Sequence, residues 1–90
     1  MSVKVFINPS LTYLTDDEEV VEVEGKNVGE CLEQVIARFP GLREPLFGED
    51  GRLNNHIDIF VNTESAYPEE LAKPVRDGDE LNIISMVAGG

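Results

Sequence analysis

The sequence predicts an α+β fold, in which a small mixed sheet of four to five strands packs on one main helix. Apolar residues alternate with other residues at 3–7 and again at 57–61, the period-two pattern of half-buried strands. Between these segments, an apolar stripe at helical spacing runs from Val28 to Phe39. The resulting order of strand, strand, helix, strand, short strand, strand is typical of a roll with one helix lying across the sheet.

The first two strands should pair early and antiparallel. Val3, Val5 and Ile7 carry the alternation, which stops at Pro9 because proline cannot serve a central ladder. Residues 19–24 have strand composition and are followed by a Gly25-Lys26 turn. We therefore expect a loop across 10–17 to join the two strands.

The main helix has recognisable signals at both ends. Asn27 is a suitable N-cap, and Glu30 three residues later gives a variant of the capping box. Pro40-Gly41 predicts the end of the helix. Leu42, Leu46 and Phe47 allow one more short turn of helix before the turn residues of 48–51. The residues that form the apolar stripe are Val28, Leu32, Val35, Ile36 and Phe39.

The C-terminal half predicts the remaining strands. Residues 57–61 form one strand, and a polar stretch follows at 63–73. Pro74-Val75-Arg76 is compatible with a short edge strand, and Asp77-Gly78 is a strong turn signal. Residues 81–84 form the last strand, which runs parallel to the first if the helix serves as the crossover.

Composition indicates one globular domain at 1–84 and a flexible C-terminal tail at 85–90. Eighteen acidic residues against seven basic ones give a net charge of −11, which opposes binding to nucleic acid or anionic membranes and favours a basic partner surface. Met1-Ser2-Val3-Lys4 begins no signal peptide, and the longest apolar run is far shorter than the ~20 residues of a membrane span, so we expect a cytoplasmic protein.

The sequence ends in Ser85-Met86-Val87-Ala88-Gly89-Gly90. Glycine permits close backbone approach and any φ, so a terminal carboxylate carried by two glycines can enter a narrow slot in a partner enzyme. We expect the chemistry of this protein to occur at that end.

Several stretches together resemble the ThiS/MoaD-type sulfur carriers, which have the ubiquitin-like β-grasp fold. The resemblance covers nearly the whole chain and looks closer to MoaD-like and CysO-like proteins than to the shorter ThiS chains. The stretches that carry it are Val28-Gly29-Glu30, Phe39-Pro40-Gly41-Leu42, Ile57-Asp58-Ile59-Phe60-Val61-Asn62, Asp77-Gly78-Asp79-Glu80 and Val87-Ala88-Gly89-Gly90.

The resemblance implies that the protein is a carrier and not an enzyme. In the mechanism that this resemblance implies, an adenylating enzyme similar to ubiquitin-activating enzymes consumes ATP to activate the carboxylate of Gly90, which follows Gly89. A sulfur donor enzyme then converts Gly90 to a thiocarboxylate. No cofactor is bound by the carrier itself, and no catalytic side chain is needed.

Three functions stay open. The leading one is a sulfur carrier. Its first-choice pathway is molybdopterin synthesis, as the small subunit of molybdopterin synthase; cysteine synthesis comes close behind, and thiamine synthesis is a further alternative. Its acceptor would be the molybdopterin synthase large subunit, a cysteine synthase or a thiazole synthase. The second is a ubiquitin-like modifier joined through Gly90 to lysines. The third is a plain β-grasp binding module with an inert tail.

Side chains elsewhere offer little chemistry. The single cysteine, Cys31, excludes an internal disulfide and lies beside the helix stripe, where an inert buried thiol is commoner than a sulfur relay. The sequence offers no base, metal or nucleophile partner for His56, so we expect a solvated loop residue, and no metal site is expected. The acidic clusters 16–19 and 69–70 are expected to be solvated faces that could steer docking.

Strand alternation predicts a surface for partners. If Val5 and Ile59 face the helix, Phe6 and Phe60 point to the opposite face. Ile84 and Met86 join them there, and Val87 and Ala88 continue toward the tail. Such an exposed apolar patch is typical of a partner interface. A register shifted by one residue would instead place these side chains in the core.

Overall fold

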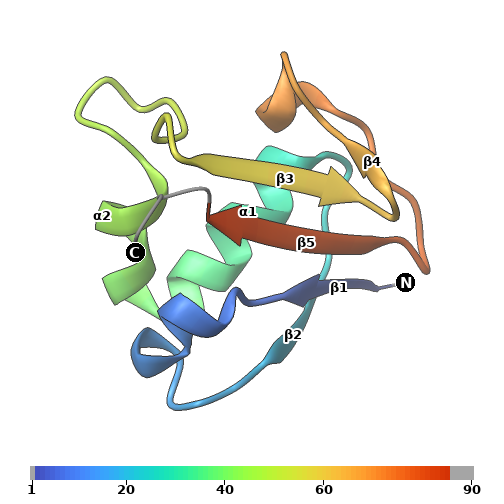
Figure 1. Ribbon diagram of the computed structural model, residues 1–90. Coiled ribbons are helices and arrows are strands. Elements are labelled where there is room, and N and C mark those ends of the chain that lie inside the picture. Colours follow the sequence, from blue (N-terminus) through green and yellow to red (C-terminus); the bar gives the residue numbers. More distant parts are fainter. Residues whose placement is uncertain (1, 86–90) are drawn as a thin grey trace.

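The computed structural model describes residues 2–85, which form one mixed sheet with a helix packed across one face (Figure 1). The sheet has five strands in the order β2-β1-β5-β3-β4. The elements in chain order are β1 (Val3–Phe6), η1 (Pro9–Leu14), β2 (Val20–Val23), α1 (Val28–Arg38), η2 (Pro40–Leu42), α2 (Arg43–Leu46), β3 (Ile57–Val61), β4 (Glu64–Ser65), η3 (Glu70–Ala72) and β5 (Glu80–Ser85).

The strand directions confirm the predicted mixed sheet. β1 pairs antiparallel with β2 and parallel with β5, while β3 pairs antiparallel with both β4 and β5. A parallel pair needs a long crossover connection, and α1 lies within the connection between β1 and β5. β5 therefore occupies the centre of the sheet, between β1 and β3.

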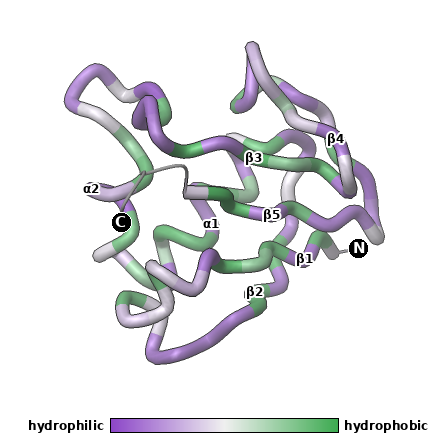
Figure 2. The backbone as a smooth tube through the Cα atoms, viewed as in Figure 1, coloured by the Kyte–Doolittle hydropathy of each residue, from purple (hydrophilic) through white to green (hydrophobic). Residues whose placement is uncertain are grey.

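One core fills the space between the sheet and α1. The stripe residues within α1, from Val28 to Ile36, are buried, and Phe39 just past the helix is half-buried. The inward positions of β1, β3 and β5 are buried against the helix. Figure 2 shows hydrophobic residues concentrated in the central strands and α1, and hydrophilic residues along the connections. The fully buried large side chains include Leu32, Leu42, Leu46, Ile59, Leu81 and Ile83.

The N-terminus of α1 is capped as predicted, with one difference in partner. The Asn27 side chain accepts a hydrogen bond from the Glu30 backbone N–H at 2.8 Å. The Glu30 carboxylate reaches back to the backbone N–H of Lys26, at 2.8 Å, instead of that of Asn27. The capping pair thus holds both the first turn of the helix and the turn before it.

Two connections differ from the sequence-based expectation. The segment expected to be a loop after β1 contains η1, capped by Asn8 and anchored by the buried Leu11. The expectation of an edge strand at Pro74-Val75-Arg76 is wrong. Instead, the Val75 N–H donates to the Lys26 carbonyl, and Pro74 forms an isolated bridge with Asn27. This segment therefore braces the start of α1.

The sheet edge beyond β3 is β4. A two-residue turn, in which Asn62 has a left-handed φ of 58°, reverses the chain so that Val61 pairs with Glu64. Asparagine tolerates this conformation better than most residues. The short polar strand then closes the sheet on this side.

Candidate functional site

The outer face of the sheet, which points away from α1, carries an apolar patch made of Phe6, Phe60 and Ile84. Phe6 on β1 and Phe60 on β3 both pair in register with Asn82 of the central strand β5. The two phenylalanines therefore lie on either side of Asn82. Ile84 follows on β5 and pairs with Asp58. We call these three apolar residues the outer-face patch.

The burial pattern confirms the predicted register. Val5, Ile59 and Ile83 are buried in the core, whereas the alternate residues Phe6, Phe60 and Ile84 are half-buried and lie outside the core cluster. A register shifted by one residue would have reversed this pattern. Partner binding by the outer-face patch stays a prediction, supported by its position.

Further side chains of this face extend beyond the residues predicted from the sequence. Val20 on β2, which is 37% exposed, pairs with Phe6 and extends the patch toward the sheet edge. The Ser65 Oγ donates to both carboxylate oxygens of Asp58, at 3.1 and 2.9 Å. The alternation that placed Phe60 and Ile84 also places Asp58 and Asn82 outward, so the same rule would have found them.

Charged side chains lie at both ends of the outer face. Lys4 pairs in register with Glu22 on β2 and with Glu80 on β5, and all three side chains are exposed. The exposed turn at 16–19 precedes Val20 and places four acidic residues at the opposite end of β2, beside the Phe6 end of β1. An apolar centre with a charged border is the usual arrangement of a protein–protein interface.

β5 leads directly into the C-terminal segment. The strand ends at Ser85, which pairs with Ile57, so it includes one residue that was expected to begin the tail. The remaining predicted site residues, Met86, Val87, Ala88, Gly89 and Gly90, lie outside the described residues. The described part of the site is thus the outer-face patch, on and beside the strand that precedes this segment.

Cys31 is a fully buried thiol, as expected. Burial raises the pKa of Cys31 to about 11, and the negative charge of Glu30 contributes in the same direction. The thiol is therefore protonated at neutral pH, whereas a nucleophilic sulfur relay requires the thiolate. This setting does not support a relay function.

The remaining candidates do not belong to the outer-face patch itself. His56 is half-buried in the turn before β3, and the acidic residues of 16–19 are exposed. Glu69 is exposed as expected, but Glu70 is half-buried at the start of η3. Among residues 2–85, no three His, Cys, Asp or Glu side chains group to hold a metal ion. Within the same residues, no helix has the length and apolar character to cross a membrane.

Comparisons with known proteins agree with this architecture. The chain is 37% identical over 71 residues to small archaeal modifier protein 1 of Haloferax volcanii, covering 78% of each chain. It is 31% identical over 93 aligned positions to the sulfur carrier protein CysO of Mycobacterium tuberculosis, covering 100% of each. A chain in the crystal structure of the Amycolatopsis orientalis BexX/CysO complex matches with a TM-score of 0.88 and 36% identity, covering 98% of this chain and 99% of that one.

The fold and these relatives define a ubiquitin-like β-grasp protein of the sulfur carrier or modifier type. The chain belongs to the ThiS family, whose model matches residues 5–90. The family match extends over the C-terminal segment on which the expected chemistry depends.

Proposed function

We propose that this protein is a sulfur carrier whose Gly90 carboxylate is adenylated by a partner enzyme and converted to a thiocarboxylate. The observation that best supports this function is the position of β5. It lies between Phe6 and Phe60 in the sheet and leads into the C-terminal segment. A partner enzyme that binds the outer-face patch therefore binds next to the strand that precedes the reacting end.

The chemistry explains why the carrier needs a partner. A carboxylate is a poor electrophile, because its charge is delocalised and its oxygen is a bad leaving group. The carboxylate attacks the α-phosphate of ATP and releases pyrophosphate, which leaves an acyl-adenylate. A sulfide equivalent then displaces AMP and forms a carbon–sulfur bond. The anionic sulfur of the thiocarboxylate is a nucleophile at neutral pH, and tethering it to a docked protein raises its effective concentration at the acceptor.

The outer-face patch has the composition of an interface centre. Fully burying one exposed large apolar side chain contributes about 1.5–3 kcal/mol. Phe6, Phe60 and Ile84 are already half-buried, so each would contribute part of that amount on binding. The amide of Asn82 lies between the two phenylalanines and must find a partner when it is buried. It would therefore add specificity to the apolar contact.

For the acceptor, the match over the full chain to the sulfur carrier protein CysO favours a cysteine synthase over the molybdopterin synthase large subunit, which is the first choice from the sequence alone. Affinity capture on the native chain distinguishes the two, with a Phe60→Asp bait as the matched control. We expect the native bait to capture a cysteine synthase and the Phe60→Asp bait not to capture it. Capture of a molybdopterin or thiazole synthase instead would contradict this choice of pathway and preserve the carrier function.

Conjugation to lysines is the second candidate, because the chain is 37% identical to a protein named as a small archaeal modifier. The two functions predict different products in the cell. A carrier yields a free pool in which sulfur replaces one terminal oxygen, detected by intact-mass analysis. A modifier yields slower-migrating conjugates recognised by an antibody against this chain.

A further inference from the structure

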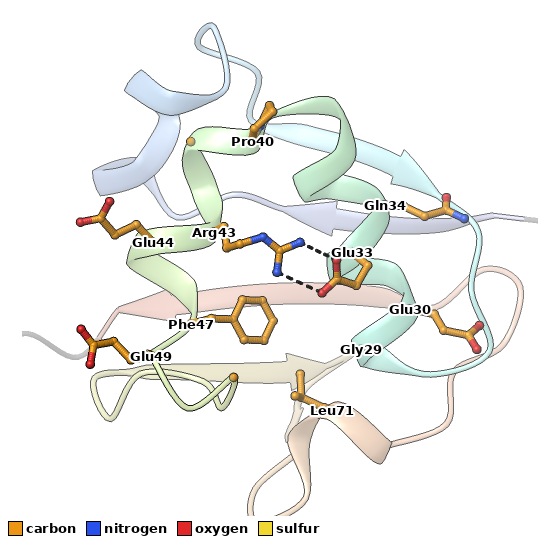
Figure 3. A pocket seen from close by; sticks show the side chains of 13 residues that line it. Gly29, Glu30, Glu33, Gln34, Pro40, Arg43, Glu44, Phe47, Glu49 and Leu71 are labelled. Atoms are coloured by element: carbon orange, nitrogen blue, oxygen red, sulfur yellow. Dashed lines mark hydrogen bonds and ion pairs between the residues drawn. The ribbon is translucent and has the colours of Figure 1, made fainter.

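A broad open groove lies on the helix side of the molecule, remote from the outer-face patch. Its volume is about 1070 Å³, and it runs between α1 on one wall and α2 with the following loop on the other (Figure 3). Leu71 of η3 closes one end. Because α1 packs on the inner face of the sheet, this groove and the outer-face patch are on opposite sides of the protein.

The groove has an apolar floor and an acidic rim. Phe47 projects into its middle and lies opposite Leu71, and both side chains are half-buried. Among the described residues 2–85, its charged lining comprises four glutamates and one cation, Arg43. The glutamates are Glu30, Glu33, Glu44 and Glu49.

The one cation is already paired within the protein. The Arg43 guanidinium donates to both carboxylate oxygens of Glu33, at 2.7 and 3.4 Å. The two side chains remain 56% and 55% exposed, so the pair is a surface ion pair that contributes about 0–1 kcal/mol. A guanidinium or ammonium from another molecule can therefore replace Arg43 at Glu33 at little cost.

The geometry favours a polypeptide occupant over a small molecule. Small-molecule sites are typically enclosed, and a few preorganised polar groups converge in them. In residues 2–85, every buried side-chain nitrogen and oxygen already has a hydrogen-bond partner, so none of these atoms needs a ligand to satisfy it. An open groove with a hydrophobic floor and a charged border fits an amphipathic segment.

We propose that this groove binds a basic amphipathic segment of a partner protein. One large apolar side chain of the segment packs on Phe47 and Leu71, while its arginines or lysines pair with Glu33, Glu44 and Glu49. The net charge of the rim and the net charge of −11 of the whole chain favour such a segment. This inference is independent of the proposed sulfur transfer. It allows a second protein to bind while the outer-face patch is occupied.

Two synthetic peptides test the proposal against the isotope-labelled full chain by NMR titration. The first carries arginines and lysines around a central leucine and phenylalanine. The second has the same charges, but serine replaces both apolar residues. We expect the first peptide to shift the backbone amides of Phe47, Gly48 and Leu71 and leave those of Phe6 and Phe60 in place, and the second to bind at least about tenfold more weakly.

A matched pair of variants separates the groove from general charge attraction. The groove variant, Glu44→Lys/Glu49→Lys, reverses two charges on the rim. Neither carboxylate makes a hydrogen bond within residues 2–85, so the change breaks no such contact there. The control variant, Glu18→Lys/Glu64→Lys, makes the same change in net charge outside the groove. Thermal unfolding first verifies that both variants are folded. The groove variant should lose about tenfold or more in affinity, and the control should lose clearly less. Equal losses, equal binding of the two peptides, or shifts centred on the outer face would each overturn the proposal.

Discussion

Gly25 lies so close to Cys31 that a Cβ atom at position 25 would stand 2.9 Å from the Cys31 Sγ and 3.0 Å from its backbone nitrogen. The turn that contains Gly25 is fastened to α1 on both sides. The Glu24 N–H donates to the Gln34 side chain, and the Lys26 N–H donates to Glu30. The turn therefore covers the thiol and has little freedom to move away.

Replacing Gly25 with alanine should destabilise the fold by about 1–3 kcal/mol, because the added methyl group meets backbone and a buried sulfur. Gly41→Ala is the matched control, since its Cβ would meet only the tip of the Leu14 side chain, at 3.2 Å. Urea unfolding measures both variants. A Gly25→Ala variant as stable as the control would show that the turn can shift after all.

The buried thiol should make stability fall at alkaline pH. The pKa of Cys31 is raised from an ordinary value of 9.0 to about 11 in the folded protein. Above pH 9 the unfolded chain therefore loses a proton that the folded chain keeps. The free energy of unfolding should decline most steeply between pH 9 and 11, by at most about 1.4 kcal/mol per pH unit, and Cys31 should contribute little below about pH 8.

Urea unfolding across this pH range measures the decline. The Cys31→Ala variant is the control for the other groups that titrate at alkaline pH. A native curve parallel to that of Cys31→Ala would contradict the assigned burial of the thiol.

Cys31→Ala should also retain sulfur transfer, because the proposed mechanism places sulfur on the terminal carboxylate and on no side chain. The variant leaves a small cavity, so a loss of stability of about 1 kcal/mol is expected. Thiocarboxylate formation by the folded variant is the measurement. Complete loss of transfer would show that the thiol is a relay.

Phe60→Asp should separate stability from binding. On the half-buried outer face the new carboxylate stays solvated, so the unfolding midpoint should change little. In a complex it would be buried without a partner, which costs several kcal/mol and should weaken partner affinity by more than about tenfold. Ile59→Asp is the control, because Ile59 is fully buried and the same charge should unfold the protein. If Phe60→Asp unfolds as well, Phe6 and Ile84 lose their assignment to the outer face too.

Patterns repeated over several residues were sufficient to predict most of the fold. Val5 and Phe6 belong to a period-two pattern, and Asn27 with Glu30 forms a local cap, so their environments follow from neighbours in the sequence. The error at Val75 has a tertiary cause. Its N–H is satisfied by Lys26, far away in the chain, and three residues are too few for a period to show.

The two partner surfaces differ in how far sequence can predict them. The outer-face patch follows from alternation in β1, β3 and β5 once the strand pairing is assumed. The helix-side groove requires α1, α2 and η3 to meet, which places Phe47 and Leu71 in one groove although neither belongs to a long periodic segment. Such a surface can be found only when the tertiary structure is known.

Intact-mass analysis of the native chain and of a chain lacking Gly90 tests the central claim most directly. Each is incubated with the adenylating enzyme, ATP and a sulfur donor, after circular dichroism has verified that both are folded. The native chain should gain the mass difference between sulfur and oxygen, and the shortened chain should gain none. Two results would contradict the assignment of Gly90 as the sulfur-carrying residue. One is a shortened chain that gains sulfur on its terminal carboxylate. The other is a native chain that gains no sulfur although the adenylating enzyme binds it.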